Sequence, residues 1–167
     1  MPIQKLKNFL DENGVHYVSI RHSPAMTAQE VAASAHIPGK EVAKVVMVLL
    51  DHVMAMAVLP ASYKVDFTLL KEASGAREAR LATEGEFGEK FPECELGAMP
   101  PFGNLYGMAV WVAESLAEDA EISFNAGSHS ELIKMAYEDF DRLVRPMVIR
   151  FSEPALPAVG GPDLWDD

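Results

Sequence analysis

The chain has 167 residues, of which 49% are hydrophobic and 23% charged, the balance of a globular domain rather than a disordered chain. Its formal net charge is −11, from 25 acidic and 14 basic residues, which argues against a bulk electrostatic grip on nucleic-acid phosphates. No apolar run approaches the roughly 20 residues of a membrane span, and the single cysteine, Cys94, cannot form an internal disulfide. We therefore expect a cytoplasmic protein without a membrane segment.

Helices are predicted from hydrophobic periodicity and from capping signals. Thr27 and Glu30 form a Thr-x-x-Glu capping box, and Thr83 and Glu86 form a second one. The predicted helices cover residues 2–13, residues 28–36, residues 67–73 with Asp66 as the cap, a short segment from Thr83 to 91–92, and a segment capped by Asp139 that runs to about Val144.

The predicted strands are short and rich in β-branched residues. Segments 42–50 and 53–59 are joined by a turn at Asp51-His52, which predicts a hairpin. Alternating apolar residues favour a strand over a helix for 131–137. The other predicted strands are 15–19, 79–82, 105–113, 120–124 and 147–151.

These elements form neither a regular βαβ series nor an all-β pattern. They predict an α+β (mixed α/β) domain whose single sheet curls towards a barrel. We expect this domain to cover residues 1–152 and the acidic stretch 153–167, rich in proline and glycine, to form a poorly ordered tail.

Lys44 is the first candidate for chemistry, because it stands inside the apolar strand 42–50. Both faces of this strand are otherwise predicted to be buried. The ammonium group must then find a partner or open onto a cavity, since an unpaired buried charge is costly. The alternative is an exposed strand face on which the lysine stem lies along apolar surface.

A second candidate is the run Asn-Ala-Gly-Ser-His that ends at His129. Gly127 and Ser128 would let a ligand approach the backbone closely. The alternative is a turn with a surface histidine. Neighbouring side chains on an extended backbone point apart, so Ser128 and His129 do not make a nucleophilic dyad.

A third candidate is the loop 97–104, with the sequence Gly-Ala-Met-Pro-Pro-Phe-Gly-Asn. Its prolines fix the backbone and its glycines flank them, which predicts a rigid loop with exposed amides. Such amides could donate hydrogen bonds to a carbonyl or phosphate oxygen. The alternative is a simple connecting turn. The histidines show no metal-ligand spacing, so no metal site is predicted.

Taken in order, these features resemble the YbaK family, the free-standing relatives of the editing domain of bacterial prolyl-tRNA synthetases. The resemblance rests on the Thr-x-x-Glu helix, Pro-Gly-x-x-x-x-Lys before an apolar strand, Pro-Pro-Phe-Gly, Gly-Ser-His and a final Asp-Phe helix. It covers about residues 1–150. It implies a curled, barrel-like sheet flanked by helices, and hydrolysis of the ester bond of mischarged aminoacyl-tRNA carrying a small amino acid.

The resemblance also implies roles for particular residues. The family's strand lysine falls on Lys44, which would hold the terminal phosphate or the carbonyl region of the substrate, and His129 would orient the substrate or water. The catalytic candidates are Lys44, Gly127, Ser128 and His129. The substrate-binding candidates are Thr27, Gly97, Met99, Pro100, Pro101, Phe102, Gly103 and Asn104. No metal or cofactor is required, because backbone amides can stabilise the oxyanion that forms during ester hydrolysis.

The implied partner is the acylated 3′ end of tRNA, with an aminoacyl-tRNA synthetase as a further candidate that could steer the tRNA. We expect no DNA or membrane partner, and a monomer or weak homodimer. Two other functions stay open: a non-catalytic module of the same fold that binds a small molecule or nucleotide end, and a hydrolase of another small ester.

Overall fold

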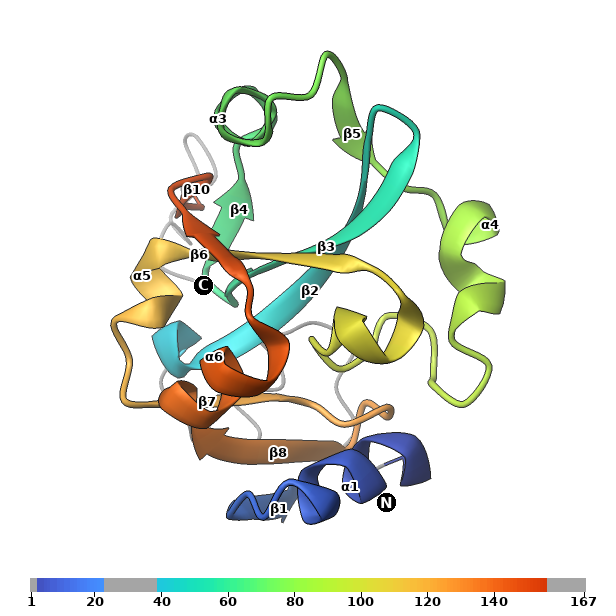
Figure 1. Cartoon of the computed structure of the whole chain (residues 1–167), viewed down its shortest axis with the longest axis vertical. Coiled ribbons are helices and arrows are strands. Elements are labelled where there is room, and N and C mark those ends of the chain that lie inside the picture. Colours follow the sequence, from blue (N-terminus) through green and yellow to red (C-terminus); the bar gives the residue numbers. More distant parts are fainter. Residues whose placement is uncertain (1–2, 23–38, 156–167) are drawn as a thin grey trace, which may run out of the picture.

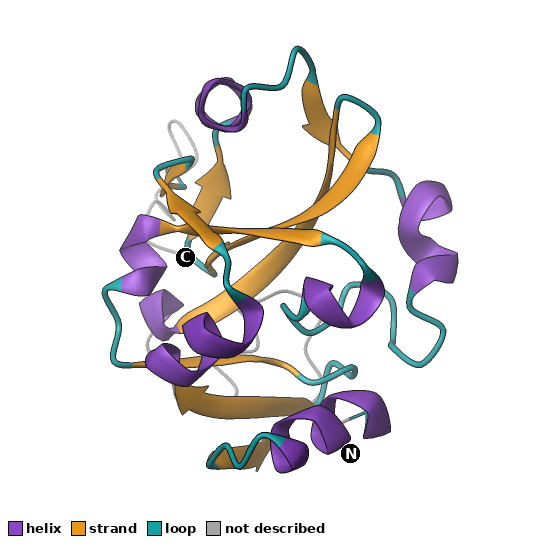
Figure 2. Cartoon of the chain, in the orientation of Figure 1, coloured by secondary structure: helices purple, strands orange, loops and turns teal. Residues whose placement is uncertain are grey.

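The structure is a computed structural model that describes residues 3–22 and 39–155. Its centre is an eight-stranded mixed sheet in the order β1-β8-β7-β2-β3-β6-β9, with β5 paired to β2, and β4 and β10 form a separate two-stranded sheet. Figures 1 and 2 show curled strands in the middle and helices around them. The strands are β1 (Tyr17–Arg21), β2 (Val42–Leu50), β3 (Val53–Pro60), β4 (Tyr63–Val65), β5 (Ala79–Leu81), β6 (Ala109–Ala113), β7 (Glu121–Asn125), β8 (Glu131–Ala136), β9 (Met147–Ile149) and β10 (Ser152–Pro154).

Short helices flank the sheet, with α1 and α3 at opposite ends of the molecule (Figure 1). None of the described helices is long and apolar enough to cross a membrane. The predicted helix 28–36 and its capping residue Thr27 lie outside the described residues. The α-helices are α1 (Gln4–Glu12), α3 (Phe67–Ser74), α4 (Glu84–Phe87), α5 (Glu114–Ala117) and α6 (Tyr137–Val144), and the 3-10 helices are η1 (Gly39–Glu41), η2 (Gly88–Lys90) and η3 (Gly103–Tyr106).

The β2–β3 hairpin lies in the middle of the sheet. Its two turn residues, Asp51 and His52, have φ of +50° and +69°, the geometry of the tight turn that suits the twist of two antiparallel strands. The Asp51 carboxylate accepts hydrogen bonds from the backbone amides of Arg77 and Glu78 at 2.9 Å. The hairpin tip is thereby tied to the segment that leads into β5.

Both faces of β2 are buried, as its sequence predicts. Ala43, Met47 and Leu49 belong to the larger hydrophobic cluster, which also contains the apolar faces of α1 and α6. Val48 points to the other face and belongs to a smaller cluster that includes Leu70 of α3. The central strand therefore separates two cores, and a polar group on either face must lie at the margin of one of them.

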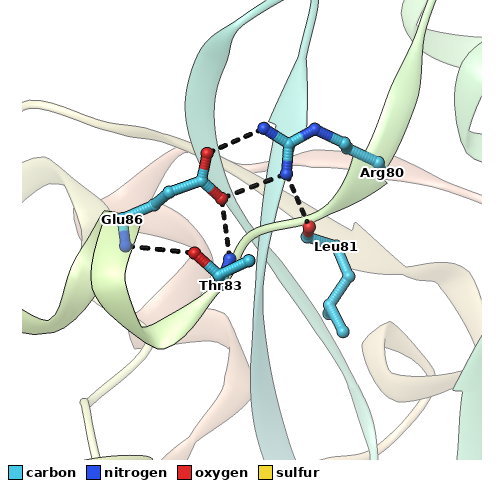
Figure 3. Close-up of polar contacts among 4 residues, drawn as sticks. All are labelled: Arg80, Leu81, Thr83 and Glu86. Carbon is cyan, nitrogen blue, oxygen red and sulfur yellow. Dashed lines mark hydrogen bonds and ion pairs between the residues drawn. The ribbon is translucent and has the colours of Figure 1, made fainter.

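The connection from β5 to α4 shows how local signals fix an element (Figure 3). Thr83 and Glu86 form the predicted capping box. The Glu86 carboxylate also accepts two hydrogen bonds from Arg80, at 3.0 and 2.7 Å, and Arg80 donates to the carbonyl of Leu81. The two bonds from Arg80, and after them the one from the Thr83 backbone amide, lower the pKa of Glu86 to about 2.

Several element boundaries differ from the predicted ones. The predicted strand 105–113 is extended only in β6, because residues 103–106 form η3. Helix α6 begins at Tyr137, so Asp139 lies in the first turn of the helix and not at the cap. In the first turn, its negative charge still interacts favourably with the helix dipole. Strand β10 pairs with β4, and the amide of Ala155 donates to Ser62. Regular structure thus extends past the boundary predicted at residue 152.

Candidate functional site

Lys44 lies on β2 opposite Leu59 of β3. The alternation of side chains along a strand places it on the face that carries Val48, away from the larger core. Its side chain is half-buried. Burial lowers the pKa of Lys44 below its ordinary value, and within residues 3–22 and 39–155 no carboxylate lies at ion-pair distance from its ammonium. Lys44 is therefore a partly desolvated cation without an acidic partner among the described residues.

Strand β7 lies beside this lysine. It runs parallel to β2, with Val42 paired to Ser123 and Ala43 to Phe124. Continuing that register by one residue brings Asn125 next to Lys44, on the face opposite Phe124. The Asn125 Oδ1 atom is buried and has no hydrogen-bond partner in the part of the chain that the structure describes. Asn125 opens the Asn-Ala-Gly-Ser-His run, but its place beside Lys44 depends on the pairing of β7 with β2, which that run does not predict.

His129 is buried, with 7% of its surface exposed, so it is not a surface histidine. Its backbone amide donates to Glu95 Oε1 at 2.7 Å, and its Nε2 lies 2.7 Å from the carbonyl oxygen of Leu96. A carbonyl oxygen only accepts, so Nε2 carries the proton in this bond. The other ring nitrogen, Nδ1, is buried and has no partner among residues 3–22 and 39–155. The imidazole thus binds the 95–98 segment through Nε2, and its Nδ1 makes no hydrogen bond to a described residue.

Gly127 completes the contact between the two loops. Its amide donates to Ala98 at 3.0 Å, and its carbonyl accepts from the Glu95 amide at 2.7 Å. Its φ is +102°, and a Cβ at this position would overlap the side chain of Ile3, so the residue must be glycine for both reasons. These two hydrogen bonds hold the 95–98 segment against the 127–129 turn.

The rest of the 97–104 loop is more buried than its composition suggests. Phe102 is fully buried, with its ring 5.5 Å from that of Phe124 and 5.4 Å from that of Phe140. A Cβ on Gly103 would lie 2.7 Å from a methyl group of Val110. The side chain of Phe102 therefore packs in the core, so any contribution of this residue to a binding site would have to come from its backbone. Met99, Pro100 and Pro101 are also buried, whereas Gly97 and Asn104 are exposed.

The two loops and Lys44 are connected through β7. This strand pairs with β2 beside Lys44 and continues directly into the 126–129 turn. Among the described residues, no hydrogen bond or ring contact joins Lys44 to His129 directly. In the part of the chain that the structure describes, the backbone amide of Ser128 has no hydrogen-bond acceptor, although the amides of Gly127 and His129 on either side of it are both bonded. Within this part of the chain, the 127–129 turn therefore has one backbone donor without an acceptor, and it directly follows the strand that pairs beside Lys44.

Burial raises the pKa of the half-buried Cys94 thiol, and Glu93 raises it further. A thiol with a raised pKa is a poor nucleophile. The described part of the chain contains no group of three or more His, Cys, Asp or Glu side chains that could hold a metal ion. Thr27, the remaining binding candidate, lies outside the described residues.

Comparison with solved structures finds the same fold in several proteins. The hypothetical protein APE2540 matches with a TM-score of 0.80 and 20% identity, over 90% of this chain and 100% of that one. A protein provisionally described as a trans-editing enzyme for prolyl tRNA synthetase matches with a TM-score of 0.76 and 18% identity, over 90% and 96% of the two chains. A third, provisionally described as a signal transduction protein from Marinobacter aquaeolei VT8, gives 0.73 and 17% identity over 91% of this chain and 31% of that one.

These likenesses concern the fold, and they confirm the predicted mixed domain with a curled sheet and flanking helices. No protein with a curated description matches this chain. The model of the aminoacyl-tRNA editing domain family matches residues 22–143, a segment that contains Lys44, the 97–104 loop and the Gly-Ser-His turn. The chain therefore belongs to the aminoacyl-tRNA editing domain family, with the YbaK-like fold that its motifs predict.

Proposed function

We propose that this protein is a trans-editing aminoacyl-tRNA deacylase that hydrolyses the ester bond of mischarged tRNA carrying a small amino acid. The observation that carries the proposal is Lys44, a half-buried ammonium with no acidic partner among the described residues. A charge in this position gains a partner when an anion or a polarised carbonyl enters the site. Family membership supports tRNA as the source of that ligand.

The turn at 127–129 supplies the second element of the proposed mechanism. When water attacks the ester carbonyl carbon, negative charge develops on the carbonyl oxygen. The unbonded amide of Ser128 is a candidate donor to that oxygen, and its neighbours' hydrogen bonds hold it in place beforehand. The tetrahedral intermediate then breaks its bond to the ribose oxygen, which takes up a proton and leaves the free amino acid.

Lys44 and His129 have different roles in this mechanism. Lys44 holds the terminal phosphate or the carbonyl region of the substrate and does not act as a nucleophile. His129 is a positioning residue, because its Nε2 is engaged by Leu96 and its contacts keep the turn against the 95–98 segment. Neither role requires a metal ion. Six residues of the 97–104 loop are also proposed to bind the substrate, chiefly through their backbone atoms. They are Gly97, Met99, Pro100, Pro101, Gly103 and Asn104.

Incubation of the pure protein with a panel of mischarged tRNAs tests the proposal. Alanyl-, seryl-, threonyl- and cysteinyl-tRNA should include at least one whose half-life shortens, with and without EDTA, and Lys44→Ala should abolish the effect. Unchanged half-lives across the panel would favour the non-catalytic module of the same fold. Activity lost in EDTA and restored by zinc would overturn the metal-independent mechanism.

The proposed partners follow from the same site. The acylated 3′ end of tRNA enters this site. Because the net charge of −11 disfavours contact with the tRNA phosphates, we propose that a synthetase or the locally less acidic segment 64–80 positions the body of the tRNA. The proposal includes a cytoplasmic location and a monomer or weak homodimer.

A further inference from the structure

The face of the sheet that carries Lys44 also presents a hydrogen-bond acceptor without a donor. Continuing the β2–β7 register by one residue places Asn125 beside Lys44, and its Oδ1 is buried with no hydrogen-bond partner among the described residues. A buried acceptor left unsatisfied costs free energy, on the order of 1 to 3 kcal/mol. Such groups are rare in folded proteins and call for an explanation.

The chemistry of the neighbourhood decides what kind of donor fits. Lys44 is cationic and Lys134 of β8 pairs with Ser123 on the same face. Lys134 has Glu121 as its ion-pair partner at 3.4 Å, but Lys44 has no carboxylate partner among the described residues. A second cation beside Lys44 would meet like-charge repulsion in a partly desolvated place. A neutral hydroxyl group is therefore a better partner for the Asn125 carboxamide than an ammonium group.

We propose that Asn125 is a substrate-binding residue that accepts a hydrogen bond from the free hydroxyl of the terminal ribose, next to the esterified oxygen. This inference rests on the proposed function, because an aminoacyl ester of tRNA always has such a hydroxyl beside the reacting bond. Asn125 as a whole is only part-buried, so rotation about its side-chain torsions can bring Oδ1 to the ligand. Lys44, on the neighbouring strand with a longer side chain, then contacts the carbonyl or phosphate of the same ligand.

Binding of stable analogues tests the contact without any turnover. Two tRNA ends are compared, both with the amino acid linked through an amide at the 3′ position, one with a 2′-hydroxyl and one with a 2′-hydrogen. The wild type should bind the hydroxyl form about 3- to 10-fold more tightly, the effect of one hydrogen bond. Asn125→Ala should bind both forms equally, at the affinity of the wild type for the deoxy form.

Two further variants separate recognition from a structural role. Asn125→Asp should keep the preference for the hydroxyl form, because a carboxylate oxygen still accepts. Asn8→Ala changes an exposed asparagine on α1 and should leave both affinities unchanged. A loss of affinity in Asn125→Ala that is equal for both analogues would show that Asn125 only supports the fold, and would overturn the inference.

The outcomes also separate this inference from the proposed function. If the wild type hydrolyses mischarged tRNA but shows no preference for the hydroxyl form, the inference fails and the deacylase stands. If it prefers the hydroxyl form but hydrolyses no member of the panel, Asn125 serves a binding module and the proposed function fails. An Asn125→Ala effect that depends on the α-amino group of the analogue, instead of the hydroxyl, would assign Oδ1 to that group and refute the hydroxyl contact.

Discussion

The Glu95 carboxylate accepts a hydrogen bond from the backbone amide of His129 at 2.7 Å, while the backbone amide of Glu95 donates to Gly127, also at 2.7 Å. One residue of the 95–98 segment therefore fixes the 127–129 turn through both its side chain and its main chain. The amide of Ser128 lies between these two anchor points.

Replacement of Glu95 tests whether this anchoring matters to activity. Glu95→Ala removes the acceptor for the His129 amide and should lower the rate of deacylation about 10-fold, the effect of roughly 1.4 kcal/mol in the activation barrier. Glu95→Gln keeps an acceptor oxygen and should retain most of the activity. Single-turnover rates on the best substrate of the panel give the comparison, and Glu93→Ala, an exposed neighbour, is the control. Equal rates for Glu95→Ala and the wild type would show that the turn holds its shape without this bond.

Lys44→Met should make the protein more stable and inactive. The lowered pKa of Lys44 means that the unfolded chain binds its proton more tightly, so the charged lysine destabilises the fold at neutral pH. A methionine of similar length removes that cost, which we expect to raise the melting temperature by about 2–4 °C, the equivalent of about 1 kcal/mol.

The same pKa gives a pH dependence with a definite sign. The difference in stability between Lys44→Met and the wild type should shrink as the pH rises from the lowered pKa of Lys44 towards the ordinary pKa of lysine. The reason is that Lys44 loses its proton at a lower pH in the folded protein than in the unfolded chain. Thermal melts of both proteins at pH 7 and pH 10 measure this convergence. A variant that melts below the wild type at pH 7 would mean that the ammonium group is satisfied in the folded protein.

Gly127→Ala should destabilise the protein by about 1–3 kcal/mol, the range for overpacking a core. The added methyl would overlap Ile3, and the φ of +102° is unfavourable for alanine. Ile3→Ala in the same chain removes the overlap but not the backbone strain, so the double variant should lose less stability than the two single variants together. Urea unfolding measures all four proteins. The control is Gly85→Ala, whose Cβ would meet only Thr83 Oγ1 at 3.9 Å, and it should be neutral or slightly stabilising. If the stability losses of Gly127→Ala and Ile3→Ala were fully additive in the double variant, the contact between the two residues would be contradicted.

Glu86→Gln should lower the stability of the protein near neutral pH but not at low pH. The two hydrogen bonds from Arg80 and the bonds of the Thr83 cap hold the pKa of Glu86 at about 2, below the ordinary value. Its contribution is therefore complete above about pH 5 and disappears as the pH falls towards 2. Melting curves of the wild type and variant should differ at pH 6 and converge near pH 2. A constant difference over this range would show that the carboxylate charge plays no part in the junction drawn in Figure 3.

Local signals predicted the parts of the fold that are determined locally. The Asp51-His52 turn fixes the hairpin, Asp66 caps α3 by accepting from two backbone amides, and the alternation in 131–136 gives β8. Lys44 was found because a single charge interrupts an apolar strand. Each of these depends on residues within a few positions of one another.

The features that were missed depend on contacts between distant segments. Nothing within 121–125 reveals that β7 pairs in parallel with β2, so the position of Asn125 beside Lys44 could not be read from the sequence. The burial of Phe102 was hidden in a loop whose glycines and prolines suggest exposure. Short elements such as α5 and β4 carry too few residues to show a period and form only where the surrounding sheet supports them.

The position of Phe102 restricts how the 97–103 loop can move. Its ring packs against rings from α1, β7 and α6, so the 97–103 loop cannot swing outward as a lid without drawing an aromatic side chain into water. In the proposed deacylase, this loop would therefore be a rigid part of the site, and a substrate that is slightly too large would be rejected sterically. The amino acid preference would then change only through side chains that contact the acyl group, while the backbone proposed to assist hydrolysis stays the same.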